Sequence, residues 1–225
     1  MKKIIALVLT LTFVILCCAS CNNEEPNNDP VGENLEVEGT NFIFRLTADD
    51  SGKPVAATIY MWTEFLDTIT VPETVEYNGH VYPITAVGFG QGVTADPSSL
   101  KHLVVSKNVK TIADNAFGTC QNLSTIAFSE GLEVIGSGAF PATAITTLEF
   151  PSTLKEIGKG AFTNCLSLKT VLFNKEIVTI ADGAFLCCPS VETISIPRAF
   201  SDRIEAIFPY STTVTEGTCQ VVYPD

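Results

Sequence analysis

The chain has 225 residues, of which 46% are hydrophobic and 17% are charged, a composition typical of an ordered globular protein. Its 25 acidic residues outnumber its 13 basic ones, and the net charge is −12 at pH 7. Because such a surface repels a phosphate backbone, we expect no nucleic-acid partner.

The N-terminal segment is organised like an export signal. Two lysines at positions 2 and 3 precede an apolar run, residues 4–16, which is too short to cross a bilayer comfortably. The signal ends in Cys18-Ala19-Ser20-Cys21, which resembles the bacterial lipobox, where small residues precede the lipidated cysteine. Residues 1–20 are therefore predicted to be a lipoprotein signal peptide, with Cys21 as the lipidated first residue. An ordinary cleavage after Ser20, releasing a soluble protein, is the alternative.

A polar stretch follows the cysteine. Residues 22–38 are rich in Asn, Glu, Asp, Pro and Gly, which bury too little apolar surface to fold. Residues 21–39 are therefore predicted to be the lipidated cysteine and a flexible tether. Two or more acyl chains give stable anchoring, so the predicted location is the outer membrane or cell surface, lipid-anchored. Loss of the two signal lysines leaves 11 basic and 25 acidic residues, a net charge of −14.

Residues 40–83 are predicted to form an N-terminal β cap. Apolar and polar residues alternate over residues 42–46 and 56–62, as they do in strands. Residues 71–83 are typical of a hairpin, because Asn78-Gly79 favours a tight turn. Such a cap would cover the open edge of a following sheet, which could otherwise pair with another chain.

A repeat organises residues 84–200. Its clearest marker is a phenylalanine after Asn-Ala or Gly-Ala, which returns at nearly constant spacing; the middle spacing is one residue shorter than the other two. The four phenylalanines are Phe117, Phe140, Phe162 and Phe185. Each copy opens apolar-x-x-apolar-x-apolar, the pattern of a leucine-rich-repeat strand, in which alternate side chains enter the core. A degenerate copy at residues 84–89 and an insertion at residues 90–98 precede the regular array, and an incomplete copy begins at Val191.

These features predict a mainly β fold with short helical turns, a leucine-rich-repeat solenoid of parallel stacked strands with an N-terminal β cap. A second short extended segment, residues 109–112 and its equivalents, should complete each coil. Residues 201–225 are predicted to form a C-terminal cap. No long helix is expected.

The array resembles the BspA-like leucine-rich repeats of bacterial surface proteins over about residues 71–197. The shared phrase is an apolar strand, Pro, an apolar residue, Ile-Gly, Ala-Phe and Cys. It is represented by residues 145–151, Leu154, Ile157-Gly158, Ala161-Phe162 and Cys165. The resemblance implies a surface lipoprotein whose partners are host or neighbouring-cell surface proteins. Because the repeat is a scaffold, function must lie in its exposed residues.

The cysteines outside the signal favour structural roles. Cys120, Cys165 and Cys188 each lie three residues before the next copy's first apolar residue, which suggests a ladder of buried thiols. A disulfide between Cys165 and Cys188, on neighbouring coils, or between Cys187 and Cys219 stays open, since export permits oxidation.

No catalytic, cofactor or metal constellation is visible. The two histidines, His80 and His102, have no metal-ligand spacing and no adjacent nucleophile, and are assigned to the hairpin and to an outward strand position. The glycine-rich residues 88–92 lack the Lys and Ser/Thr of a P-loop, and no loop has EF-hand spacing. We therefore expect no catalytic residue, no cofactor, no metal site and no enzyme activity.

The outward side chains of the repeat strands are the candidate binding face, because positions between two core-facing residues must point away from the core. The ten candidates are His102, Val104, Thr125, Ala127, Thr147, Glu149, Thr170, Leu172, Thr193 and Ser195. Four of them form a predicted threonine ladder, for which ordinary β-propensity is the alternative explanation.

The expected function is that of a cell-envelope lipoprotein acting as a protein-binding or adhesion module through this face. The alternative is a structural or glycan-capturing accessory component of an envelope complex. A glycan is thus the second class of partner, although the outward set holds no aromatic platform for sugar. Contact with the membrane is expected through the lipid anchor.

Overall fold

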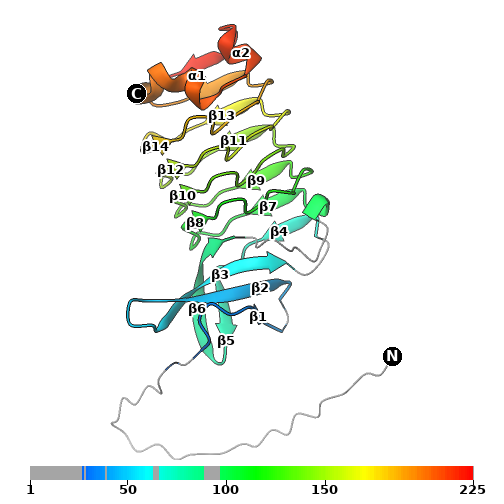
Figure 1. The fold of residues 1–225 in the computed structure, drawn as a ribbon, viewed down its shortest axis with the longest axis vertical. Helices are drawn as coiled ribbons and strands as arrows, with labels where there is room; N and C mark the ends of the chain where they lie inside the picture. Colours follow the sequence, from blue (N-terminus) through cyan, green and yellow to red (C-terminus); the bar gives the residue numbers. More distant parts are fainter. Residues whose placement is uncertain (1–26, 28, 39, 63–65, 89–96, 225) are drawn as a thin grey trace, which may run out of the picture.

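The computed structural model describes residues 27, 29–38, 40–62, 66–88 and 97–224. It is an elongated solenoid of short parallel strands standing on a cap of longer strands (Figure 1). The prediction of a mainly β solenoid with short helical turns is confirmed. The signal peptide, Cys21 and most of the insertion at residues 90–98 lie outside the described residues.

The cap is built by β1 (Leu35–Glu36), β2 (Phe42–Ala48), β3 (Pro54–Trp62), β5 (Thr74–Tyr77) and β6 (His80–Val87), which also open the largest sheet. Of these, β2, β3 and β6 are long, with 7, 9 and 8 residues. The hairpin between β5 and β6 turns at Asn78 and Gly79, whose φ angles are 50° and 79°. Positive φ at both central residues is the requirement of a type I′ turn, so the Asn-Gly prediction is confirmed.

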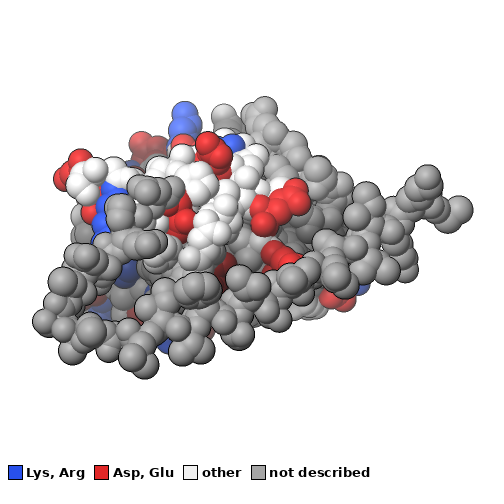
Figure 2. All heavy atoms as spheres, turned by 90° about the horizontal axis from the view of Figure 1, so that it is seen from below, with Lys and Arg blue, Asp and Glu red and all other residues white. Residues whose placement is uncertain are grey.

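Carboxylates are prominent at the cap end. Glu33, Glu36 and Glu76 are exposed there, and Figure 2 shows acidic side chains across the described part of this end. The cap thus carries part of the chain's net negative charge.

Each regular coil contributes two short strands on two sides of the solenoid (Figure 1). The first strands are β4 (Thr68–Thr70), β7 (His102–Val104), β9 (Thr125–Ala127), β11 (Thr147–Glu149), β13 (Thr170–Leu172), β15 (Thr193–Ser195) and β16 (Gln220–Val222). The second strands are β8 (Thr111–Ile112), β10 (Val134–Ile135), β12 (Glu156–Ile157) and β14 (Thr179–Ile180). Both sets stack in parallel, as the repeat predicts.

The solenoid extends into both segments that were predicted to be caps. β4, within residues 40–83, pairs in parallel with β7, and β6 continues into the large sheet by pairing with β8. The physical reason is that Leu66, Ile69 and Val71 repeat the apolar-x-x-apolar-x-apolar opening. At the other end β16 pairs in parallel with β15. Cap and array therefore share sheets, and no boundary separates them at residue 84.

Helical turns are short, as expected. They are η1 (Pro97–Ser99), η2 (Arg198–Arg203), α1 (Ile204–Ile207) and α2 (Thr212–Thr215). The last three cover the C-terminal end of the solenoid (Figure 1). There Phe208 stacks on Phe185 with ring centroids 4.6 Å apart. The C-terminal cap thus closes the core with a further ring.

The predicted tether is folded in its second half, which corrects the expectation for residues 21–39. β1 pairs antiparallel with β2, and Val31 forms a bridge with Leu46. Leu35 is buried. The prediction rested on the polar composition of the whole segment and did not account for its few apolar residues, which pack against the cap beside β2.

A column of phenylalanine rings forms the centre of the core. Phe117, Phe140, Phe162 and Phe185 are almost fully buried, and successive ring centroids lie 4.8, 5.4 and 5.2 Å apart, nearly parallel. A residue that recurs once per coil occupies the same place in successive cross-sections, which is why these four rings stack in one column.

The residue two before each of these rings has a left-handed backbone. Asn115, Gly138, Gly160 and Gly183 have φ between 57° and 73°. Only glycine adopts this region freely, and asparagine tolerates it better than most residues. In the recurring Asn/Gly-Ala-Phe motif, the Asn or Gly therefore permits the left-handed turn, and the Phe two residues later enters the core.

Phe162→Ala should lower the free energy of unfolding by about 3 to 5 kcal/mol, because it removes a ring stacked on both sides. Denaturant unfolding of the mature protein measures this. Leu166→Ala is the control, since Leu166 is 61% exposed in the same coil, and it should cost less than about 1 kcal/mol. Similar losses in the two variants would contradict the stacked core.

Candidate functional site

The ten predicted face residues lie on the first strands with the expected alternation. His102, Val104, Thr125, Ala127, Thr147 and Glu149 are exposed, whereas Thr170, Leu172, Thr193 and Ser195 are half-buried. The accessible part of the face is therefore carried by β7, β9 and β11. Sequence reasoning missed Thr68 and Thr70, which continue the exposed row on β4.

The face is interrupted between β9 and β11. β4, β7 and β9 form a three-stranded sheet, and β11, β13, β15 and β16 form a separate four-stranded sheet. Thr147 lies beside Thr170, and Thr170 beside Thr193, but Thr125 lies beside His102, whose Nδ1 is 2.7 Å from Thr125 Oγ1. The prediction of one four-threonine ladder is wrong, because the interruption separates Thr125 from the other three.

The interruption coincides with the coil that is one residue short. Ile145 lies five positions after Phe140, whereas Leu123 lies six positions after Phe117. Thr143 takes the ladder position of the cysteines, is buried, and has its Oγ1 3.2 Å from Cys165 Sγ. On the other side of the coil β10 and β12 remain paired. We attribute the lost register to this turn, which brings β11 to the sheet one residue early.

A groove opens at the interruption, and we call it the seam groove. Its volume is about 420 Å³, and its lining residues are Ile126, Ala127, Phe128, Glu130, Glu149, Phe150 and Pro151. Ile126 and Phe128 are half-buried here, although their equivalents in the preceding coil, Leu103 and Val105, are fully buried. The seam groove therefore exposes core side chains.

Two carboxylates border the seam groove. Glu130 accepts hydrogen bonds from Ser152 Oγ at 2.8 Å and from Ser152 N at 3.2 Å. These hydrogen bonds, the side-chain one above all, hold the pKa of the Glu130 carboxyl below its usual value. Glu149 is exposed on β11. The groove thus combines apolar walls with negative charge.

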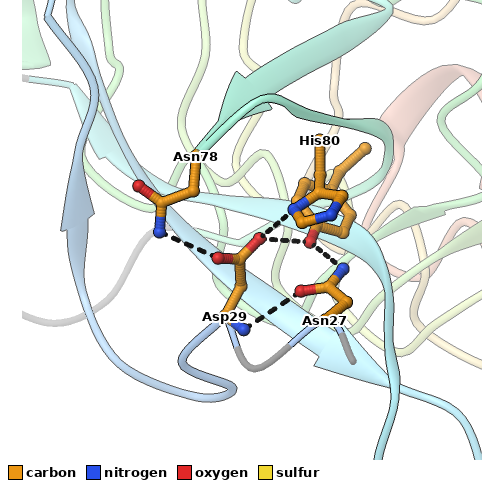
Figure 3. Close-up of polar contacts among 5 residues, drawn as sticks. Asn27, Asp29, Asn78 and His80 are labelled. Atoms are coloured by element: carbon orange, nitrogen blue, oxygen red, sulfur yellow. Dashed lines mark hydrogen bonds and ion pairs between the residues drawn. The ribbon is translucent and has the colours of Figure 1, made fainter. Parts of the chain in front are cut away.

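A second polar site lies at the base of the cap, and sequence reasoning missed it (Figure 3). The buried carboxylate of Asp29 accepts hydrogen bonds from Tyr82 Oη at 2.5 Å and Asn78 Nδ2 at 2.8 Å, and His80 Nδ1 lies 3.0 Å away. Asn27 Nδ2 also donates to Tyr82 Oη, at 2.5 Å. The Asn78-Gly79-His80 turn is visible in the sequence, but its partner Asp29 lies far upstream in the chain.

The electrostatics of Asp29 favour its ionised form. Burial acts to raise the pKa of this carboxyl, but hydrogen bonds from Tyr82, Asn78 and His80 outweigh burial and leave the pKa below the usual 3.8. Burial and the neighbouring carboxylate raise the pKa of the Tyr82 hydroxyl. These contacts fasten Asn27 and Asp29 to the hairpin of β5 and β6.

The five cysteines in the described part of the chain are free thiols, and neither pair left open by the sequence is bonded. Cys120, Cys165 and Cys188 are buried, which confirms the ladder of structural thiols. Burial raises the pKa of the Cys120 thiol to about 12, and Cys188 Sγ donates to the Phe162 carbonyl at 3.1 Å. The Cys120 thiol should therefore react slowly, because the thiolate is the reactive form.

Among the described residues, no three His, Cys, Asp or Glu side chains come together in a group that could hold a metal ion. In the same ranges, no helix has the length and apolar character needed to cross a membrane.

Stacked parallel strands with a recurring ring per coil define a leucine-rich-repeat solenoid. A family model for the BspA type leucine-rich repeat region matches six copies across residues 93–215, more than half of the chain. The protein therefore belongs to the BspA-type leucine-rich-repeat family, as the sequence resemblance predicted. A search of curated proteins found no match.

Solved structures support the fold. The leucine-rich repeat protein of T. pallidum has a TM-score of 0.62 at 24% identity, over 72% of this chain and 72% of its own. A leucine-rich repeat protein from Eubacterium ventriosum has a TM-score of 0.51 at 22% identity, over 68% of this chain and 41% of its own. At these identities the likeness concerns the fold alone.

Asp29→Asn should release the N-terminal segment from the cap. The folded-state pKa of Asp29 is depressed, so its stabilisation is present above about pH 4 and is lost as pH falls through the folded pKa. We therefore expect amide exchange protection in β1 to fall in acid for the parent and to be low at pH 7 in the variant. Asp50→Asn, at an exposed hairpin position, should leave β1 protected. Equal protection in both variants at pH 7 would contradict the fastening role.

Proposed function

We propose that this protein is an exported, lipid-anchored surface protein that binds other proteins through the outward face of β4, β7, β9 and β11, and that it is not an enzyme. The observation that carries the proposal is the row of exposed side chains on these strands, which is in register over β4, β7 and β9 and continues beyond the interruption on β11. Extended solenoid faces are surfaces to which partners commonly bind.

The chemistry of the face suits a protein partner. Val104 is 38% exposed and lies between Thr70 of β4 and Ala127 of β9, while Thr68 and Thr125 flank His102 in the neighbouring row. This mixture offers apolar area and hydrogen bonds with few charges, so binding should depend only modestly on salt.

Surface location and anchoring rest on residues outside the described part of the chain. The lipobox-like ending at Cys21 and the resemblance to BspA-like surface proteins support them. Host or neighbouring-cell surface proteins are the proposed partners. Capture of a glycan for an envelope complex is the alternative.

Cys21→Ala should abolish lipidation and release the protein from the membrane fraction, because the acylated sulfur is then missing. Mass spectrometry and fractionation of cells that express the full precursor measure both effects. Ser20→Ala is the control, because a small residue at this position should still permit processing. A Cys21→Ala protein that stays membrane-bound with the parent's mass would contradict the anchor.

Val104→Arg should lower the affinity for a partner by about tenfold or more, because it places a long charged side chain in the middle of the face. A pull-down with the mature protein identifies the partners, and calorimetry then measures the affinity of each one. Proteins and glycans are tested in separate experiments. Val178→Arg is the matched control, since Val178 is 69% exposed beside β14. Equal affinities in both folded variants would place binding elsewhere, and binding by glycans alone would favour the alternative.

A further inference from the structure

We propose that the seam groove receives an arginine side chain from an extended segment of a protein partner. This inference rests on the proposed protein-binding function and assigns a specific contact to it. Three features of the groove support it: unpaired backbone groups, aromatic side chains in its wall and two carboxylates at its border.

The first feature is the loss of inter-coil hydrogen bonds at the seam. The equivalent residue of each neighbouring coil donates to the next coil, as Val105 N does to Ala127 O at 2.9 Å and Phe150 N to Leu172 O at 3.1 Å. Among the described residues, no backbone hydrogen bond joins β9 to β11. Polar groups facing the seam, including the N–H of Phe128, are therefore left for solvent or for a ligand. An extended peptide supplies matching donors and acceptors.

The second feature is the pair of aromatic rings on the wall. The centroids of Phe128 and Phe150 lie 5.8 Å apart with their planes 23° from parallel. Phe128 is half-buried, and Ile126 beside it is half-buried as well. A planar guanidinium stacks favourably on an aromatic ring, and its methylene stem covers apolar surface. Arginine has both parts in one side chain.

The third feature is charge. Glu130 and Glu149 border the groove, and no Lys or Arg is among its lining residues. Ser152 donates to both oxygens of the exposed Glu130 carboxylate and so orients it at the border of the groove. Arginine, with its planar fork of donors, fits two carboxylates better than lysine, which is a point charge.

The probe is the capped peptide acetyl-Thr-Val-Arg-Val-Thr-amide, titrated into the isotope-labelled mature protein and followed by amide chemical shifts. We expect saturable shifts centred on Phe128, Thr147 and Glu149, with a Kd below about 1 mM. The same peptide with citrulline, which keeps the shape without the charge, should bind about tenfold more weakly or worse.

Variants locate the contact. Glu149→Gln should lower the affinity for the arginine peptide by about tenfold. Glu156→Gln should leave it unchanged, because Glu156 is exposed on β12, away from the groove lining. Inserting Asn after Ala144 restores the length of the neighbouring coils, and we expect it to join β9 to β11 and abolish peptide binding. Glu149→Gln provides the test if the insertion variant does not fold.

The outcomes separate this inference from the proposed function. Absence of saturable shifts at the groove, or equal binding of the citrulline peptide, overturns the arginine site. If Val104→Arg still weakens partner binding in that case, the proposed function stands without the arginine site, since Val104 does not line the groove. If the peptide binds the groove but Val104→Arg leaves partner affinity unchanged, the arginine site is supported. The proposal that partners bind the outward face of β4, β7 and β9 is then contradicted.

Discussion

Hydrogen bonding between successive coils is the constraint on which the structure depends. Each coil can donate to the next only if equivalent residues arrive at the same height, as where Phe140 N donates to Ala161 O at 2.7 Å and Phe162 N to Ala184 O at 2.9 Å. A near-constant repeat length meets this condition. The phenylalanine column, the buried thiols and the left-handed turns are consequences of the same register.

The same constraint produces the candidate site. A coil shortened by one residue cannot keep both of its strands in register with the previous coil. Here the second strands stay paired, and the first strands part between β9 and β11. The cost is a set of unpaired backbone groups and partly exposed side chains at Ile126 and Phe128. Groups left unsatisfied by the fold are those that a partner can satisfy.

Periodic features were predictable from the sequence because the same residue pattern recurs in several copies of the repeat. Four copies define the phenylalanine column, and alternation defines the outward residues. The type I′ turn at Asn78-Gly79 is local and was equally readable. The seam was visible only as one shortened spacing, between Phe140 and Phe162, since the sequence alone does not say which of two strands absorbs a missing residue.

Features that depend on single long-range contacts were not predictable. Asp29 stands in a polar segment, and its partners Asn78, His80 and Tyr82 lie on a hairpin far downstream in the chain. Because of these hydrogen bonds and the pairing of Leu35–Glu36 with β2, part of the segment that was predicted to be a flexible tether belongs to the folded cap. β4 was assigned to the cap because its single apolar motif, separated from the array, gave no periodicity to recognise.

Residue-specific amide hydrogen exchange tests the central claim, that coil length sets which inter-coil hydrogen bonds form. The account predicts strong protection at Val105, Phe150 and Phe173, whose amides donate to the next coil, and exchange about a hundredfold faster or more at Phe128. Protection of Phe128 equal to that of its three equivalents would show that β9 and β11 are paired, and would contradict the account.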